Sequence, residues 1–220
     1  MNVLSVNVAR ARPNPYKTIC TTGFDKRPMA GAVQVRAPGP KDGGLGSGLV
    51  GDVVGDRANH GGDDQAVYAY AREDLDLWAA DLGRELRNGA FGENLTTVGL
   101  AVNDALIGEQ WRIGDEVVLQ ITCPRIPCVT FSGWMGERGW LKTFTRRAVP
   151  GAYLRVVRPG RIRPGDPVTI VRRPEHHVTV GLTFRALTLE PDLLPELLAA
   201  DDLPEEGKDR ARRRLPFEVG

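Results

Sequence analysis

The chain has 220 residues, of which 41% are hydrophobic and 26% charged, a composition typical of a globular protein with one large core. Its 29 Lys and Arg nearly balance 28 Asp and Glu, so no overall field favours nucleic acid or an anionic membrane. Three cysteines without a CxxC pair predict neither a disulfide framework nor a cysteine-based zinc or iron–sulfur site. Because no signal-like start or long apolar run is present, we expect a cytoplasmic protein with no membrane partner.

Short β-type runs separated by glycine and proline turns fill most of the chain. Alternating or β-branched patterns predict strands at 2–8, 32–37, 66–70, 116–123, 152–157 and 167–171. Segments such as "RIGDE" and "RPGRIRPGDP" are typical of the turns between them. Short strands bounded by such turns favour a barrel or sandwich over a βαβ sheet.

Helical spacing is found in two places. The first is residues 72–86, where Leu75, Trp78, Leu82 and Leu86 fall on one face. The second lies beyond Pro174, where leucines at helical spacing are interrupted by prolines.

The prolines at positions 191, 195 and 204 predict three short helices there rather than one long one. We therefore divide the chain into a β-barrel domain, residues 1–174, and a C-terminal three-helix unit, residues 175–220. Because three short helices bury little apolar surface on their own, this unit could form the face of a homodimer or pack back onto the barrel.

The polar run "GDRANHGGDDQ", residues 55–65, is the first candidate site. Its glycines, Gly61 and Gly62, let backbone N–H groups approach a ligand, and Arg57 and His60 can meet an anion such as phosphate. A polar loop between strands accounts for the same composition, so both interpretations stay open.

The segment "GAFGENLTTVGL", residues 89–100, is a weaker candidate. Glu93 and Asn94 follow a glycine-flanked phenylalanine and could aim a carboxylate and an amide into a cleft. A glycine-rich turn before a strand explains the segment equally well.

The third candidate is "CPRIPCVT", residues 123–130. Cys128 follows a proline in backbone that cannot belong to a regular helix, and Arg125 is near enough to favour its thiolate. A thiolate is a soft ligand that suits a soft metal centre. A buried structural thiol, or a nucleophilic pair with His60, remains open. Cys123 completes the strand pattern and is expected in the core, whereas Cys20 lies in a polar segment.

Taken together and in this order, "GDRANHGGDDQAVYAY", "FGENLTTVG" and "PRIPC" resemble the MOSC family, named for the C-terminal domain of molybdenum-cofactor sulfurases, and its YiiM-like branch in particular. The resemblance covers residues 20–172, and the tail resembles that branch's three-helix unit. Asp63 stands where the branch usually has proline, a change that removes no charged or ligating group. Residues 129–145 do not align clearly.

This resemblance implies an α+β fold, a twisted β-barrel with a small C-terminal helical unit, and a groove for the molybdenum cofactor (molybdopterin). Cys128 would ligate the molybdenum, and Glu93 and Asn94 would lie near the metal as catalytic residues. The implied cofactor-binding residues are Arg57, His60, Gly61, Gly62, Asp64, Gln65 and Arg125. At the level of the family, pyridoxal phosphate binding is also open.

The implied activity is reduction of N-hydroxylated compounds such as hydroxylaminopurine-type base analogues. Since no haem, flavin or iron–sulfur motif is evident, the electrons should come from a separate flavin-type reductase. Two alternative functions remain open. One is a sulfur-carrier or cofactor-handling module with a Cys128 persulfide. The other is a nucleic-acid-binding barrel using the arginines of residues 146–173, which the balanced charge disfavours.

Overall fold

A single eight-stranded sheet dominates the structure, a computed structural model that describes residues 1–18 and 21–218. All neighbouring strands in it are antiparallel except β6 and β7, which run parallel. In spatial order the strands are β12 (Val168–Arg172), β8 (Gln110–Ile113), β9 (Val117–Pro124), β10 (Ala152–Arg158), β6 (Val67–Ala71), β7 (Leu95–Val98), β1 (Asn2–Ala9) and β4 (Lys26–Pro28). Two small sheets pair β5 (Val33–Val35) with β11 (Gly160–Ile162) and β2 (Arg12–Pro13) with β3 (Thr21–Thr22).

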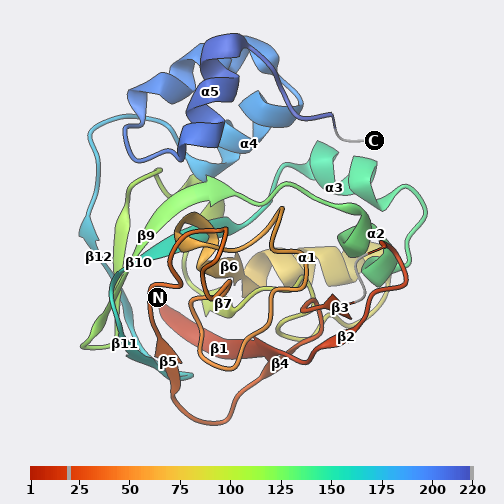
Figure 1. Cartoon of the computed structure of the whole chain (residues 1–220), viewed down its shortest axis with the longest axis vertical. Coiled ribbons are helices and arrows are strands. Elements are labelled where there is room, and N and C mark those ends of the chain that lie inside the picture. Colours follow the sequence, from red (N-terminus) through yellow and green to blue (C-terminus); the bar gives the residue numbers. More distant parts are fainter. Residues whose placement is uncertain (19–20, 219–220) are drawn as a thin grey trace.

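The large sheet curves so that the start of β1 returns beside the residues that lead into β12 (Figure 1). Val3 N–H donates to the Asp166 carbonyl at 2.9 Å, and Gly165 N–H donates to the Val3 carbonyl at 2.8 Å. These bonds join the start of β1 to the residues just before β12, so the sheet closes on itself. The predicted α+β fold with a twisted barrel is therefore confirmed.

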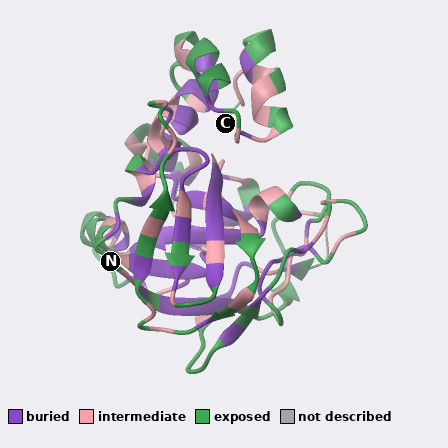
Figure 2. Ribbon diagram, turned by 90° about the vertical axis from the view of Figure 1, so that its left-hand side faces the viewer, coloured by how far each residue is buried: buried purple, intermediate pink, exposed green. Residues whose placement is uncertain are grey.

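Apolar side chains at alternate sequence positions of β9 and β10 fill much of the barrel interior, whereas β6 is buried at every position; Figure 2 shows the central strands as mostly buried. Val6, Leu119, Ile121 and Leu154 are all fully buried there. This alternation is the pattern that predicted the strands beginning at residues 2, 116 and 152. Strands β4 and β8 were not predicted, because three or four residues are too few to show a period.

Helix α1 (Arg72–Leu82) is shorter than the predicted 72–86. Gly83 ends it by adopting a left-handed conformation, φ 63°, from which its N–H donates to the carbonyls of Ala79 and Ala80. Leu86 nevertheless packs inside, so the apolar spacing was correct and the glycine decided the end of the helix.

Two helices were not predicted, α2 (Val129–Met135) and α3 (Trp140–Arg147). With α1 they enclose a second apolar cluster, which is largely aromatic. Its fully buried rings include Trp78, Phe91, Phe131, Trp140 and Phe144. The loop that follows β9 lies against this cluster, so it has firm support on one side.

Three helical segments follow the barrel: α4 (Val180–Thr188), η3 (Pro191–Ala199) and α5 (Glu205–Arg213), shown in blue at the top of Figure 1. Leu187, Leu197 and Leu203 belong to the same apolar cluster as the barrel interior. A shared cluster neither separates nor merges two domains, so the division near Pro174 stays a prediction. Two short 3₁₀ turns, η1 (Asp63–Gln65) and η2 (Val102–Asp104), lie within the barrel region. Within the described ranges, every helix is too short or too polar to cross a membrane.

Candidate functional site

Two cavities meet at the thiol of Cys128. We call the smaller one, about 110 Å³, the inner recess; its walls include Lys26, Asp52, Asn94 and Arg125. The larger one, about 810 Å³, is the outer groove. It runs between residues 55–65, which we call the His60 loop, the loop after β9 and the C-terminal helices. Five residues line both cavities: His60, Gly61, Gln65, Cys128 and Tyr153. Cys128 and the His60 loop, far apart in sequence, are therefore brought together.

The loop after β9 holds Cys128 through Arg125. The Arg125 guanidinium is buried and lies 4.2 Å from the ring centre of Phe131, 4.9 Å from that of Phe24 and 5.1 Å from that of Tyr68. Its Nη1 also donates to the Phe91 carbonyl. A cation enclosed by aromatic faces and tied to the backbone is rigid. Cys128 itself is extended, φ −130° and ψ 167°, as the residue that precedes α2.

The Cys128 thiol is half-buried and acidic. Burial alone would raise its pKa, but a hydrogen bond from His60, the charges of Arg125 and His60, and the Phe131 N–H outweigh it and lower the pKa to about 6. The thiol is therefore mostly ionised at neutral pH. A partly accessible thiolate is the species that ligates metals or attacks electrophiles.

The glycines of the His60 loop allow two backbone segments to pack closely. Gly61 and Gly62 have φ of 87° and 78°, and a Cβ on either would lie 2.7 Å from the Gly46 carbonyl oxygen or the Lys41 nitrogen. Their N–H groups are engaged, that of Gly61 by Gln65 Oε1 at 3.2 Å and that of Gly62 by the Gly46 carbonyl at 3.0 Å. The glycines thus shape the groove wall rather than offer free donors.

Glu93 and Asn94 differ although they are adjacent. Glu93 is fully buried, lines neither cavity and accepts from the N–H groups of Gly89 and Phe91 and from Thr96 Oγ1. Its burial raises the pKa of its carboxyl, against the opposing effect of these hydrogen bonds. Glu93 therefore braces the loop. Asn94 does line the inner recess, where its Nδ2 donates to Asp52 Oδ2 at 2.9 Å.

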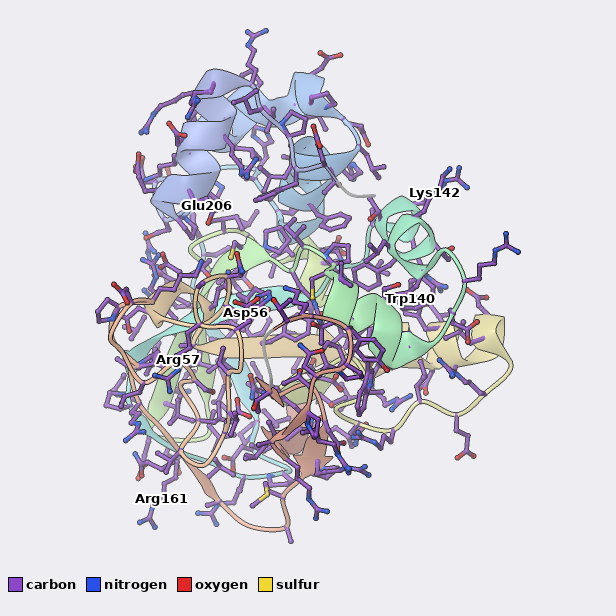
Figure 3. The ribbon with its side chains drawn as sticks, turned by 45° about the vertical axis from the view of Figure 1, so that its right-hand side comes forward. Asp56, Arg57, Trp140, Lys142, Arg161 and Glu206 are labelled. Carbon is purple, nitrogen blue, oxygen red and sulfur yellow. The ribbon has the colours of Figure 1, made fainter. Side chains whose placement is uncertain are left out.

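The other predicted cofactor-binding residues are divided between the cavities and the surface. Arg125 lines the inner recess, and Gly62 and Asp64 line the outer groove, where Asp64 pairs with Arg155 at 2.6 Å. Arg57 lines neither cavity; it is exposed, and its Nη1 donates to the Gly44 carbonyl at 3.2 Å (Figure 3). The geometry thus gives no support to Arg57 as a phosphate ligand. Cys20 lies outside the described residues.

Several residues of the cavities were missed by sequence reasoning. Lys26 and Asp52 form a buried ion pair at 2.7 Å in the inner recess. Tyr68 and Tyr153 are directly paired across β6 and β10, and burial raises the pKa of Tyr153 to about 12, so its phenol stays protonated. Lys17 and Lys41 line the outer groove. Only the strand alternation around the two tyrosines could have indicated a shared face.

The C-terminal segments form one wall of the outer groove. Leu187, Leu203, Glu206 and Phe217 line it opposite the His60 loop. Figure 3 shows Glu206 at the end of α5 that faces the barrel. Residues of the predicted helical unit therefore belong to the site and do not only cover the barrel.

Comparison with known proteins agrees with this architecture. The chain belongs to the MOSC domain family, whose model matches residues 56–169. It is 35% identical to the uncharacterized protein YflK of Bacillus subtilis (strain 168) over 226 residues, 99% of this chain and 97% of that protein.

Two further relatives match over shorter stretches. Protein YiiM of Escherichia coli (strain K12) is 30% identical over 57% of each chain. A protein named "Reductase" from Gibberella moniliformis is 31% identical over 66% of this chain, which spans only 27% of that protein. Among solved structures, YiiM from Geobacillus stearothermophilus superposes with a TM-score of 0.77 at 25% identity, covering 97% of this chain and 98% of that one. The chain is thus a YiiM-like MOSC protein.

The Cys128 thiol and the polar groups of the outer groove fit the molybdenum cofactor that the family resemblance implies. Among the described residues, no cluster of three or more His, Cys, Asp or Glu could hold a bare metal ion. A single ionised thiol beside a groove of about 810 Å³ instead suits a metal that arrives within a large organic group. Lys41 and His60 in that groove can meet an anionic phosphate, and carboxylates such as Asp64 and Glu206 can accept from N–H donors.

Proposed function

We propose that this protein is a molybdenum-cofactor-dependent reductase of N-hydroxylated compounds. The observation that carries the proposal is the Cys128 thiol, with its pKa lowered to about 6, at the junction of a large groove and a small recess. Such a junction can hold a cofactor on one side and a substrate group on the other. The name of the Gibberella relative, a reductase, supports the same class of activity.

In this proposal the outer groove holds the cofactor and Cys128 ligates its molybdenum. His60 and Lys41 bind its phosphate, while Tyr153, which keeps its proton at neutral pH, donates a hydrogen bond at the junction. When bound, the cofactor would supply two-electron redox chemistry and an acceptor for the oxygen atom of the substrate.

The chain's own residues would orient the substrate and move protons. Reducing R–NH–OH to R–NH₂ and water breaks one N–O bond and takes up two electrons and two protons. The electrons would come from a separate flavin-type reductase. His60, which contacts Cys128 and lines both cavities, can carry a proton between the groove and the recess. Phe24 and Tyr68 form an aromatic part of the recess wall.

The test compares Cys128→Ser with Cys123→Ser, expressed in a host that makes the cofactor. Molybdenum per chain is measured by mass spectrometry, and reduction of benzamidoxime is measured with a chemical electron donor. Cys128→Ser should lose both metal and activity by more than about 100-fold, beyond the effect of a typical outer-shell change. Cys123→Ser should retain both. Full molybdenum and activity in Cys128→Ser would refute the proposal.

The lowered pKa of Cys128 also suits a second function, a sulfur carrier that holds a persulfide on this thiol. Mass spectrometry of the intact protein distinguishes the two. A labile additional sulfur on Cys128 with no stoichiometric molybdenum would favour the carrier.

A further inference from the structure

Lys26 has an unused hydrogen-bond donor inside the inner recess. Its ammonium is more than nine-tenths buried and bonds to both carboxylate oxygens of Asp52, each at 2.7 Å. In the described part of the chain, Asp52 is its one side-chain partner. An ammonium has three N–H groups, so at least one remains available to a ligand in the recess that Lys26 lines.

Asp52, by contrast, is fully engaged. Besides Lys26 it accepts from the Ala9 N–H at 2.7 Å, from Ser47 Oγ at 2.6 Å and from Asn94 Nδ2 at 2.9 Å. Charge pairing with Lys26 is the main influence that lowers the pKa of Asp52 against its burial. The carboxylate therefore holds Lys26 in place and leaves the ammonium as the group that faces a ligand.

The charges in the recess favour a neutral ligand. Of the charged side chains on the recess wall, the cations Lys26 and Arg125 are matched in number by the carboxylates Asp52 and Asp56, and Lys26 pairs with Asp52 at 2.7 Å. A dianionic phosphate would meet no excess positive charge there, whereas a neutral oxygen acceptor can take the spare N–H without an electrostatic penalty. The volume, about 110 Å³, accommodates a small polar group.

We propose that the inner recess receives the N–O group of the substrate and that Lys26 donates a hydrogen bond to its oxygen. This inference rests on the proposed function. Lys26 would stabilise the oxygen as the N–O bond breaks. Two electrons, supplied originally by the flavin-type reductase, and two protons from solvent would complete the amine and a molecule of water. The recess would therefore select compounds by a slim N–O end, and the rest of the substrate would lie outside it.

The test removes the Lys26 ammonium without leaving the Asp52 carboxylate buried and unpaired. Lys26→Met alone would leave a buried carboxylate unpaired and could unfold the protein, so the variant is Lys26→Met with Asp52→Asn. Its control is Lys26→Arg, which keeps a cationic donor paired with Asp52. Correct folding is checked by circular dichroism. Affinity for pyridine N-oxide, a neutral N–O acceptor, is measured by calorimetry on metal-free protein, and kcat/KM for benzamidoxime on loaded protein.

The double variant should bind pyridine N-oxide roughly 10- to 100-fold more weakly than the control, as expected for a hydrogen bond from a charged donor. Its kcat/KM should fall by a similar factor while molybdenum per chain is unchanged. Equal N-oxide affinity in the two variants would overturn the proposal. Calorimetry with inorganic phosphate gives a second check. If the double variant lost both molybdenum and phosphate binding, Lys26 would be assigned to the cofactor and the proposal would also be overturned. Because N-oxide binding is measured without metal, its result stands even if the wild-type protein reduces no N-hydroxylated compound.

Discussion

The end of β9 and the loop that follows it place two cysteines, five residues apart, in opposite chemical environments. Cys123 and Cys128 are both half-buried and both line the outer groove. Burial raises the pKa of Cys123 to about 12, with Thr122 as its one hydrogen-bonding partner and the charges of Asp64 and Glu206 adding to the effect. Cys128 has a pKa of about 6.

The difference shows that burial alone does not decide the state of a thiol. Burial disfavours both thiolates, but near Cys128 a histidine, a guanidinium and a backbone N–H all stabilise the anion. At Cys123 two carboxylates repel it. Fixed donors and charges within a few ångströms therefore lower the pKa of one thiol and leave that of the other raised.

The largest consequence is a difference in alkylation rate. At pH 7 nearly all of Cys128 but only about 10⁻⁵ of Cys123 should be thiolate, given pKa values of about 6 and about 12. Because a more basic thiolate is intrinsically more nucleophilic, the expected ratio of rates shrinks to roughly 100- to 400-fold in favour of Cys128. Iodoacetamide labelling of metal-free protein, read by peptide mass spectrometry, measures both rates.

The pH profile is the sharper part of this experiment. The rate at Cys128 should be flat above pH 7 and fall below pH 6, whereas that at Cys123 should still be rising at pH 9. Parallel profiles for the two thiols would contradict the contrast between their environments.

A second, smaller effect concerns stability. Cys128 has a pKa of about 6 when folded and about 8.5 when unfolded, so in this window the unfolded chain binds more protons and stability rises with pH. The contribution is fully present above the unfolded value and is lost as the pH falls through about 6. Between pH 5.5 and 8.5, the free energy of unfolding of the wild type should gain on the order of 2 kcal/mol over Cys128→Ser, after allowing for solvent screening.

Urea unfolding of metal-free protein at several pH values measures this gain. Cys123→Ser is the matched control. The raised pKa of Cys123 makes its contribution present below about pH 8.5 and lost as pH rises toward about 12. Relative to Cys123→Ser, the wild type should therefore show no such gain over the same range. A gain in both comparisons would mean that the two thiols share one environment.

The sequence predicted the fold well wherever a pattern repeats over enough residues. Strands β1, β9 and β10 have seven or eight residues, so their alternation is visible. Helix α2 was missed because Gly133 lies inside it and resembles a turn residue. The structure gives this glycine another cause, since a Cβ there would lie 2.3 Å from the ring of Tyr16.

The site was predicted less evenly. The motifs predicted that Cys128 and His60 belong to one site. Residue type alone could not distinguish side chains that face a cavity from side chains that support a loop. Arg57 and Glu93 have suitable functional groups, but both form hydrogen bonds with nearby backbone groups and line neither cavity. Lys26 and Asp52 were missed because their pairing spans 26 residues and leaves no local pattern.

The smallest expected effect measures how much His60 contributes to the low pKa of Cys128. His60→Gln replaces the imidazole whose hydrogen bond is the leading influence that lowers the pKa of Cys128. The Cys128 midpoint should move up by about one to two pH units, which lowers its alkylation rate at pH 6 by roughly two- to eightfold once the higher nucleophilicity of a more basic thiolate is allowed for. Arg125 and the Phe131 N–H remain, so the midpoint should stay well below that of Cys123. The control is His177→Gln, because His177 is exposed and pairs with Glu196 on the C-terminal unit. An unmoved midpoint in His60→Gln would assign the acidity of Cys128 to Arg125 and the Phe131 N–H instead of His60.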